Sequence, residues 1–310
     1  MKNKPPKKKE KVREESVFNK KTEPLVYLIP HAIGLIFFVV YPIVNAFIMA
    51  FKNGYRINGS FEGWGVENFQ YILNDPNFAN ALKNTFIYAF TVVPIATCIS
   101  IVLAVLLNQK IKGIGLFQTI YFLPMVTSAI AIGACWRYMY HAQHGVFNYF
   151  LNLLGFESLN WLGATNGSTA LNLVAVIIFG IWNMIPFTTI LMLSGLQNID
   201  PLYYTAAKVD GASTTKQFFR ITLPLLAPTI FLTLVINIIK GFKVYNEVIP
   251  FWNGEAGYTT KNLYTLVFYI KAQFYTYNKL GYAAAASVVL FVIVLILSKI
   301  QKWIENKFTY

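Results

Sequence analysis

The sequence predicts an all-α, polytopic membrane protein with six transmembrane helices. Apolar residues make up 56% of the 310 residues and charged residues only 13%, whereas soluble domains carry about 25% charged residues. Uncharged stretches long enough to cross a hydrocarbon layer, which needs about 20 helical residues, recur along the chain. We expect spans at 25–51, 84–109, 113–136, 170–197, 221–239 and 280–298.

The remaining segments are too short to form a separate globular domain, so residues 25–310 are predicted to be one helical domain. Residues 1–24 are polar and carry nine basic side chains. A segment of this composition cannot bury enough apolar surface to fold, and we expect a disordered cytoplasmic tail. Its charge could hold it on anionic membrane lipid, or the tail could simply be solvated.

The net charge of +13 follows the membrane topology. If the N-terminus is inside, 17 basic residues fall on cytoplasmic segments and seven on outer segments. Lys and Arg sort to cytoplasmic loops in membrane proteins, so both termini are predicted to be cytoplasmic. Because this sorting accounts for the charge, no nucleic-acid partner is expected.

Catalytic chemistry has no sequence signal in this chain. It lacks a phosphate-binding G-x-x-x-x-G-K-[ST] loop, an H-E-x-x-H motif and a G-x-S-x-G elbow. His141 and His144 could supply two metal ligands, but no third ligand lies near them in the sequence. We therefore expect no enzyme activity, catalytic residue, metal or cofactor in this chain, and a partner chain that supplies energy.

The loop between the fourth and fifth spans has the local pattern of two short helices separated by a turn. Asp200 can cap the first helix, with Pro201 at its first position, and Asp210-Gly211 forms the turn. Thr214 and Gln217 have the spacing of a capping box that opens the second helix. The sorting of basic residues, three of which lie in this loop (Lys208, Lys216 and Arg220), predicts that the loop is cytoplasmic.

At this loop the chain resembles the sugar-type permease subunits of ATP-binding-cassette importers, the group that includes the larger permease of the maltose transporter. The matching residues are Ala206-Ala207, Asp210-Gly211-Ala212 and Ile221-Thr222-Leu223-Pro224, against a family pattern close to E-A-A-x-x-D-G-A followed by I-x-L-P. The resemblance is firmest over residues 81–302.

The resemblance implies that residues 197–220 form a coupling loop that docks on a dimer of ABC ATPase subunits, which bind ATP and magnesium. Thr205 stands where the family has glutamate, so one acidic contact is missing. Small side chains would allow close approach and phenylalanines would anchor the contact. The predicted docking residues are Thr205, Ala206, Ala207, Asp210, Gly211, Phe218 and Phe219. The alternative is an amphipathic loop that lies on lipid without a partner.

Polar residues recur at helical spacing in the fourth and fifth spans, where a polar face requires an internal cavity. Sugar permeases of the resembled family line their cavity from these spans, and sugars favour amide hydrogen bonds and an aromatic platform. The predicted cavity residues are Trp182, Asn183, Phe187, Asn237, Lys240 and Gly241. Lys240 could give the cavity a positive charge, or it could snorkel to the outer interface; the sequence favours snorkelling.

These observations predict a permease subunit that imports carbohydrate, with an oligosaccharide as the favoured cargo, by alternating access across a bacterial or archaeal cytoplasmic membrane. The implied partners are the ATPase dimer, a second homologous permease and an extracytoplasmic solute-binding protein. That protein would dock on outer segments 52–80, 140–169 and 246–281. Alternatives are import of glycerol phosphate or an acidic sugar, a secondary carrier, and a membrane scaffold that transports nothing.

Overall fold

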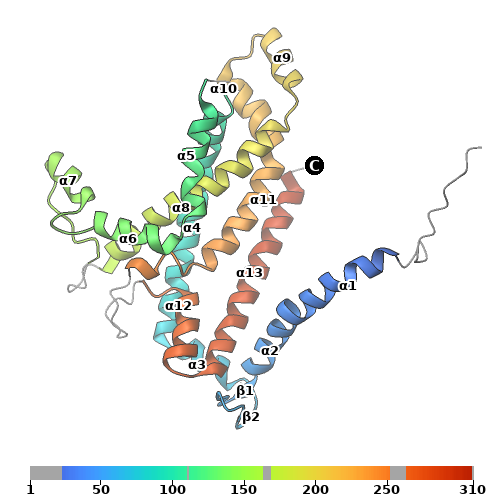
Figure 1. Ribbon diagram of the computed structural model, residues 1–310, viewed down its shortest axis with the longest axis vertical. Helices are drawn as coiled ribbons and strands as arrows, with labels where there is room; N and C mark the ends of the chain where they lie inside the picture. Colours follow the sequence, from blue (N-terminus) through green and yellow to red (C-terminus); the bar gives the residue numbers. More distant parts are fainter. Residues whose placement is uncertain (1–22, 110–111, 163–168, 252–262, 309–310) are drawn as a thin grey trace, which may run out of the picture. The chain divides into compact units, whose positions relative to one another are not determined.

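The computed structural model describes residues 23–109, 112–162, 169–251 and 263–308, and helices dominate it (Figure 1). Residues 1–22 of the predicted tail, together with parts of two outer segments, lie outside the described residues. The chain divides into two units, Met1–Ile48 and Met49–Tyr310, which are taken in turn.

The first unit contains one long apolar helix. Helix α1 (Glu23–Leu35) continues through a π-helical turn, η1 (Ile36–Val40), into α2 (Tyr41–Ala50). The stretch Tyr27–Ala50 is long and apolar enough to cross a membrane, which confirms the first predicted span. Most of its large apolar side chains are exposed, as expected of a helix that lipid surrounds.

Four further helices in the second unit match predicted spans. They are α4 (Pro76–Leu107), α8 (Thr169–Gln197), α11 (Leu223–Phe242) and α13 (Leu280–Phe308), and each belongs to a candidate span. Helix α4 begins eight residues before the prediction because Asp75 caps it, accepting a hydrogen bond from the amide of Asn77 at 2.9 Å. A Pro at the first helical position suits this start.

The predicted span at 113–136 is wrong in shape. It forms two helices, α5 (Ile114–Val126) and α6 (Ala129–Met139), which meet at an angle of 98°. Pro124 cannot donate a backbone hydrogen bond within the helix, and Thr127 and Ser128 adopt extended backbone conformations. The described residues therefore contain five unbroken candidate spans, or six if the bent pair counts as one.

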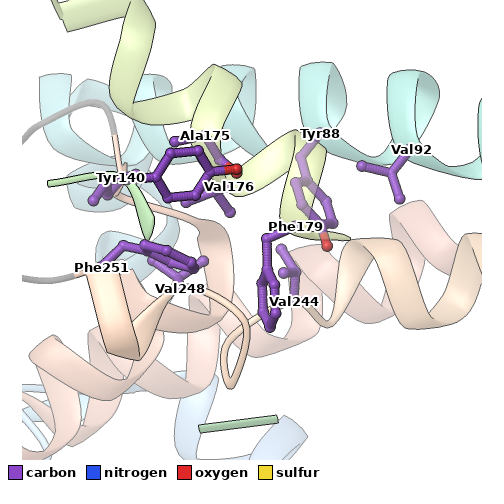
Figure 2. Close-up of a cluster of buried hydrophobic side chains, with 10 residues drawn as sticks. Tyr88, Val92, Tyr140, Ala175, Val176, Phe179, Val244, Val248 and Phe251 are labelled. Carbon is purple, nitrogen blue, oxygen red and sulfur yellow. The ribbon is translucent and has the colours of Figure 1, made fainter. Parts of the chain in front are cut away.

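The core forms where α4, α8 and α11 pack together. Side chains from α4 and α8 meet side chains of the segment that follows α11, and Figure 2 shows this cluster: Tyr88, Val92, Tyr140, Ala175, Val176, Phe179, Val244, Val248 and Phe251. Gly180 allows the close approach, because a Cβ at this position would lie 2.2 Å from the hydroxyl oxygen of Tyr88. A second apolar cluster includes Met192 on α8 and Leu226 on α11.

Short elements connect the spans. At the end of the bundle opposite α9 and α10 lie β1 (Lys52–Asn53), β2 (Gly63–Trp64), α3 (Glu67–Asn74), α12 (Leu266–Lys271) and η5 (Ala272–Thr276), whereas α7 (Val146–Leu153) lies to one side of the bundle, beyond α6 (Figure 1). The turn η3 (Ile249–Phe251) follows α11. The two strands pair antiparallel, with Lys52 opposite Trp64. The hydroxyl of Tyr269 donates to the carboxylate of Asp75 at 2.8 Å. Burial, reinforced by this bond, raises the pKa of Tyr269 well above its usual value.

The packing of the bent pair can be tested at Gly133. A Cβ there would lie 2.3 Å from Cγ of Pro250, whose ring cannot rotate away, so Gly133→Ala is expected to destabilise the protein by about 1–3 kcal/mol through overpacking. Gly115→Ala on α5 is the matched control, since nothing lies within 4 Å of its Cβ position. Thermal unfolding of the purified membrane complex measures both variants. Equal melting temperatures for the two would contradict the packing described here.

Candidate functional site

The predicted coupling loop folds as two short helices. Helix α9 (Pro201–Val209) begins after Asp200, whose carboxylate accepts from the amide of Leu202 at 2.9 Å, and this confirms the predicted cap. The chain then turns at Gly211, where φ is +73°, a conformation that glycine adopts at no steric cost. The turn separates the two helices as predicted.

The predicted start of the second helix is wrong by one residue. Helix α10 (Thr214–Gln217) is capped by Ser213, whose Oγ accepts from the amide of Lys216 at 3.3 Å. The Gln217 side chain is buried and donates to the carbonyl of Ala212 at 2.8 Å, so it does not complete a capping box with Thr214. A π-helical turn, η2 (Phe218–Thr222), joins α10 to α11.

Most of the predicted docking residues are exposed on this loop. Thr205, Ala206, Asp210, Gly211 and Phe219 are exposed, while Ala207 and Phe218 are half-buried. The hydroxyl of Thr205 donates to the carbonyl of Pro201 at 3.2 Å, so the residue at the family's glutamate position is turned back on its own helix.

The loop also exposes apolar side chains that the sequence analysis missed. They are Leu202, Tyr203 and Val209, which are 70%, 55% and 84% exposed; the predicted docking residue Phe219 is 59% exposed. Residues 202, 206 and 209 have the i, i+4, i+7 spacing of a single helix face, and this spacing could have identified Leu202 and Val209. Exposed apolar patches of this kind mark interaction surfaces.

The second feature is a cavity of about 400 Å³ between α8 and α11, here called the α8–α11 cavity. It is lined by Tyr88, Gly180, Asn183, Met184, Phe187, Ile239, Lys240, Lys243, Tyr245, Asn246 and Glu247. Three of the six predicted cavity residues, namely Asn183, Phe187 and Lys240, are in this lining.

The charged groups of the cavity have defined partners. The amine of Lys240 lies 3.4 Å from the ring centre of Phe187, a cation–π geometry. Glu247 is close enough to attract Lys240 electrostatically, and its carboxylate lies 3.5 Å from the amide nitrogen of Asn183. The structure therefore places Lys240 in the cavity lining, where the ring and the carboxylate both attract its charge. The snorkelling interpretation stays a prediction.

The other three predicted cavity residues lie outside this lining. Trp182 packs on Trp136, with ring centres 5.3 Å apart. Asn237 is fully buried, and its amide nitrogen donates to the hydroxyl of Thr188 at 2.9 Å, which ties α11 to α8. Gly241 packs against α4, since its Cβ would lie 3.1 Å from that of Ala89. The helical spacing selected the correct helices but, for these residues, the wrong edge of each.

Tyr88 and Lys243 were missed. Tyr88 comes from α4 and belongs both to the cavity lining and to the cluster of Figure 2. No local pattern in the second span could have indicated this long-range contact. Lys243 directly follows the end of α11.

No group of three or more His, Cys, Asp or Glu side chains in the described part of the chain is arranged to hold a metal ion. The rings of His141 and His144 stack with centres 5.4 Å apart. Their neighbourhood adds no acidic or thiol ligand within the described residues.

Comparisons with known proteins identify the family of the chain. Residues 76–310 match the family described as the binding-protein-dependent transport system inner membrane component. The arabinooligosaccharides transport system permease protein AraP of Bacillus subtilis is 33% identical over 295 residues, covering 94% of this chain and 91% of that protein. The sn-glycerol-3-phosphate transport system permease protein UgpA of Pectobacterium atrosepticum is 28% identical, covering 95% and 98%.

A solved structure shares the architecture. A chain of a bacterial ABC transporter that imports the acidic polysaccharide alginate superposes with a TM-score of 0.80 and 25% identity, covering 94% of this chain and 98% of that chain. A second structure of the alginate transporter, in complex with an alginate pentasaccharide-bound periplasmic protein, gives a TM-score of 0.79 and 25% identity, covering 93% and 96%.

The different positions of the two asparagines can be tested by substitution. Asn237→Ala breaks a fully buried hydrogen bond and leaves Thr188 without it, so we expect a loss of about 1–3 kcal/mol of stability. Asn183→Ala removes a half-buried side chain that faces the cavity, and its stability should stay within about 0.5 kcal/mol of the parent. Thermal unfolding of both variants checks the assignment, and a reversed order would refute it.

Proposed function

The chain belongs to the family of inner-membrane components of binding-protein-dependent transport systems, and from this premise we propose that it is a permease subunit of an ATP-driven importer of an oligosaccharide. The observation that carries the proposal is the α8–α11 cavity, which lies on the same two helices that enter the coupling loop. The chain acts as a permease and is not itself an enzyme; ATP hydrolysis belongs to partner subunits.

The cavity suits a saccharide in its chemistry. Asn183 offers an amide, Tyr88 and Tyr245 offer phenolic rings, and Phe187 offers an apolar ring face. A sugar ring presents hydroxyls at its edge and C–H groups on its face, so both kinds of partner are useful. The volume of about 400 Å³ falls in the range of about 300–1,000 Å³ that is common for ligand sites.

The charges of the cavity bear on the cargo. Lys240 and Lys243 face one carboxylate, Glu247, so the positive charge is partly neutralised and a neutral oligosaccharide fits. The excess lysine favours a second candidate, an acidic saccharide, which is the cargo class of the similar alginate transporter. Glycerol phosphate is less favoured, because the glycerol-3-phosphate permease UgpA is less similar to this chain, at 28% identity, than the arabinooligosaccharide permease AraP, at 33%.

The coupling loop supports a role for ATPase partners. Its exposed apolar face, with Leu202, Val209 and Phe219, resembles the anchors that dominate protein interfaces. A hydrogen bond of 3.0 Å between the hydroxyls of Tyr204 and Thr222 joins α9 to η2, so a displacement of α9 is passed to the start of α11. We propose that an ABC ATPase dimer, with its ATP and magnesium, closes on this surface.

The remaining partners follow from the same proposal. A second homologous permease would complete the pathway, and an extracytoplasmic solute-binding protein would deliver the saccharide to the end of the bundle that carries β1, β2 and α3. The assembly would operate in a bacterial or archaeal cytoplasmic membrane by alternating access. The similar alginate transporter is described with a periplasmic protein bound, which supports the binding-protein partner.

Substrate-stimulated ATPase activity of the complete complex in lipid tests the cargo. With its binding protein present, neutral oligosaccharides should stimulate the activity, and Lys240→Gln should retain this stimulation. If the cargo is acidic, the same variant should lose roughly tenfold to hundredfold in apparent affinity, because a hydrogen bond to a charged group is worth about 1.5–3 kcal/mol. Lys299→Gln is the control, because Lys299 lies in the C-terminal half of α13 and does not line the cavity. Failure to isolate any ATPase subunit with the chain would refute the importer.

The docking surface is tested by Phe219→Ala. Loss of an exposed anchor from a partner interface should weaken ATPase binding by about 2 kcal/mol or more while leaving the melting temperature of the isolated chain unchanged. Leu225→Ala is the matched control, since Leu225 is also exposed (43%) but lies on α11 beyond the loop. The affinity of the ATPase subunit for each variant in nanodiscs gives the comparison. Equal affinities would place the docking surface elsewhere.

A further inference from the structure

Helix α7 presents an apolar surface that no described residue covers. Viewed along the helix, four side chains fall on one side at i, i+3, i+4 and i+7, and all are substantially exposed. They are Val146 (42%), Tyr149 (64%), Phe150 (58%) and Leu153 (68%). Leu154 and Phe156 extend this surface, at 71% and 64% exposed. We call these six side chains the α7 apolar face.

The opposite side of α7 is fixed to the protein. The buried side chain of Asn148 donates to the carbonyls of Ala142 and Leu159, each at 2.8 Å. Its oxygen accepts from the amide of Leu159 at 3.1 Å and from the indole of Trp161 at 2.9 Å. Phe147 stacks on Tyr140 with ring centres 4.7 Å apart. These contacts fix the orientation of α7 about its own axis. The α7 apolar face therefore points away from the rest of the protein.

The bend between α5 and α6 bears on the depth of α7 in the membrane. Helix α5 has 13 residues and is about 20 Å long at 1.5 Å per residue, shorter than a hydrocarbon layer of about 30 Å. The chain then turns by 98° into α6. If α5 runs along the membrane normal as one half of a span, the turn of 98° makes α6 run roughly parallel to the membrane plane. Helix α7 follows α6 in the chain. Figure 1 shows α6 and α7 leaving the side of the helix bundle.

The composition of the surface favours lipid over a protein partner. Residues 145–156 contain no charged side chain, and Tyr149 is the one hydrogen-bonding side chain of the α7 apolar face. Protein interfaces carry about one hydrogen bond per 100–200 Å² and a polar rim. On α5, Leu123 and Val126 are also exposed, at 60% and 81%. Tyr149 belongs to the residue types that are enriched at membrane interfaces.

We infer that α7 is an interfacial helix whose apolar face lies in the acyl chains of the outer lipid leaflet. Such helices lie in the plane of the interface with one side immersed. Helix α6 packs on η3 at Gly133 and Pro250, and η3 follows the residues that line the α8–α11 cavity. The lipid contact therefore fixes one wall of the bundle near that cavity. The inference depends on the membrane fold and not on the identity of the cargo.

Spin labels at single cysteines test the inference in the complete transporter reconstituted in phosphatidylcholine and phosphatidylglycerol bilayers. The exposed Cys98 and Cys135 are replaced by Ala, and Leu153→Cys is compared with Glu157→Cys, which is exposed in the same segment. Oxygen, which concentrates in lipid, and a nickel chelate, which stays in water, are the two relaxing agents. Leu153 should have a much higher ratio of oxygen to nickel accessibility than Glu157. A scan of Val146–Leu153 should give oxygen maxima at the four positions of the face.

Two results would overturn the inference. Nickel accessibility at Leu153 as high as that at Glu157 would show an aqueous surface. Low accessibility to both agents at Leu153 would show that another protein, such as a partner permease or the binding protein, covers the face. Uptake by each labelled variant confirms that the complex remains assembled.

Discussion

The close crossing of α8 and α4 at Gly180 is the contact on which the rest of the structure depends. Tyr88 occupies the space that a Cβ at this position would need, and the same ring contributes to the core cluster and to the cavity wall. Any larger residue at 180 would move Tyr88 and alter both. The cavity is therefore a product of helix packing, and its polar groups are held by an apolar framework.

The same helices connect the cavity to the cytoplasmic loop. Helix α8 ends at Gln197, just before the Asp200 cap of α9, and η2 leads directly into α11. Phe218 and Lys240 are about 33 Å apart along a helix at 1.5 Å per residue. A continuous helical element of this length can carry a displacement from the loop to the cavity, and Pro228 and the π-helical turn are places where it can bend. The proposed coupling of ATP binding in a partner to access in the membrane requires a connection of this kind.

The sequence was most informative where the physical signal is local. Apolar length predicted six spans, five of which are unbroken helices in the described residues, and Asp200, Pro201 and Gly211 predicted the form of the loop. Local ambiguity explains one error, since Ser213 and Thr214 are both good caps and only the folded chain shows which hydroxyl reaches the amide of Lys216. The bend at Thr127 and Ser128 was concealed by apolar residues on both sides of it.

Long-range packing explains the other differences. Helical spacing defines a stripe on α8 and on α11, but neighbours decide which edge of the stripe faces a cavity. Asn237 lies in the contact between the two helices because it donates a hydrogen bond to Thr188. Trp182 lies in the aromatic cluster because its ring packs against that of Trp136. Tyr88 and Glu247 enter the lining from other segments, so no analysis of the two spans alone could assemble the site.

The central claim is that saccharide passes through the α8–α11 cavity, and site-directed protection tests it most directly. In the assembled transporter lacking Cys98 and Cys135, Asn183→Cys is labelled with a small, charged thiol reagent while the complex turns over. The account predicts that labelling occurs and that the transported oligosaccharide, delivered by its binding protein, slows it, whereas a sugar that is not transported has no effect. A residue that never labels, or labels at the same rate with and without the transported saccharide, would contradict the account.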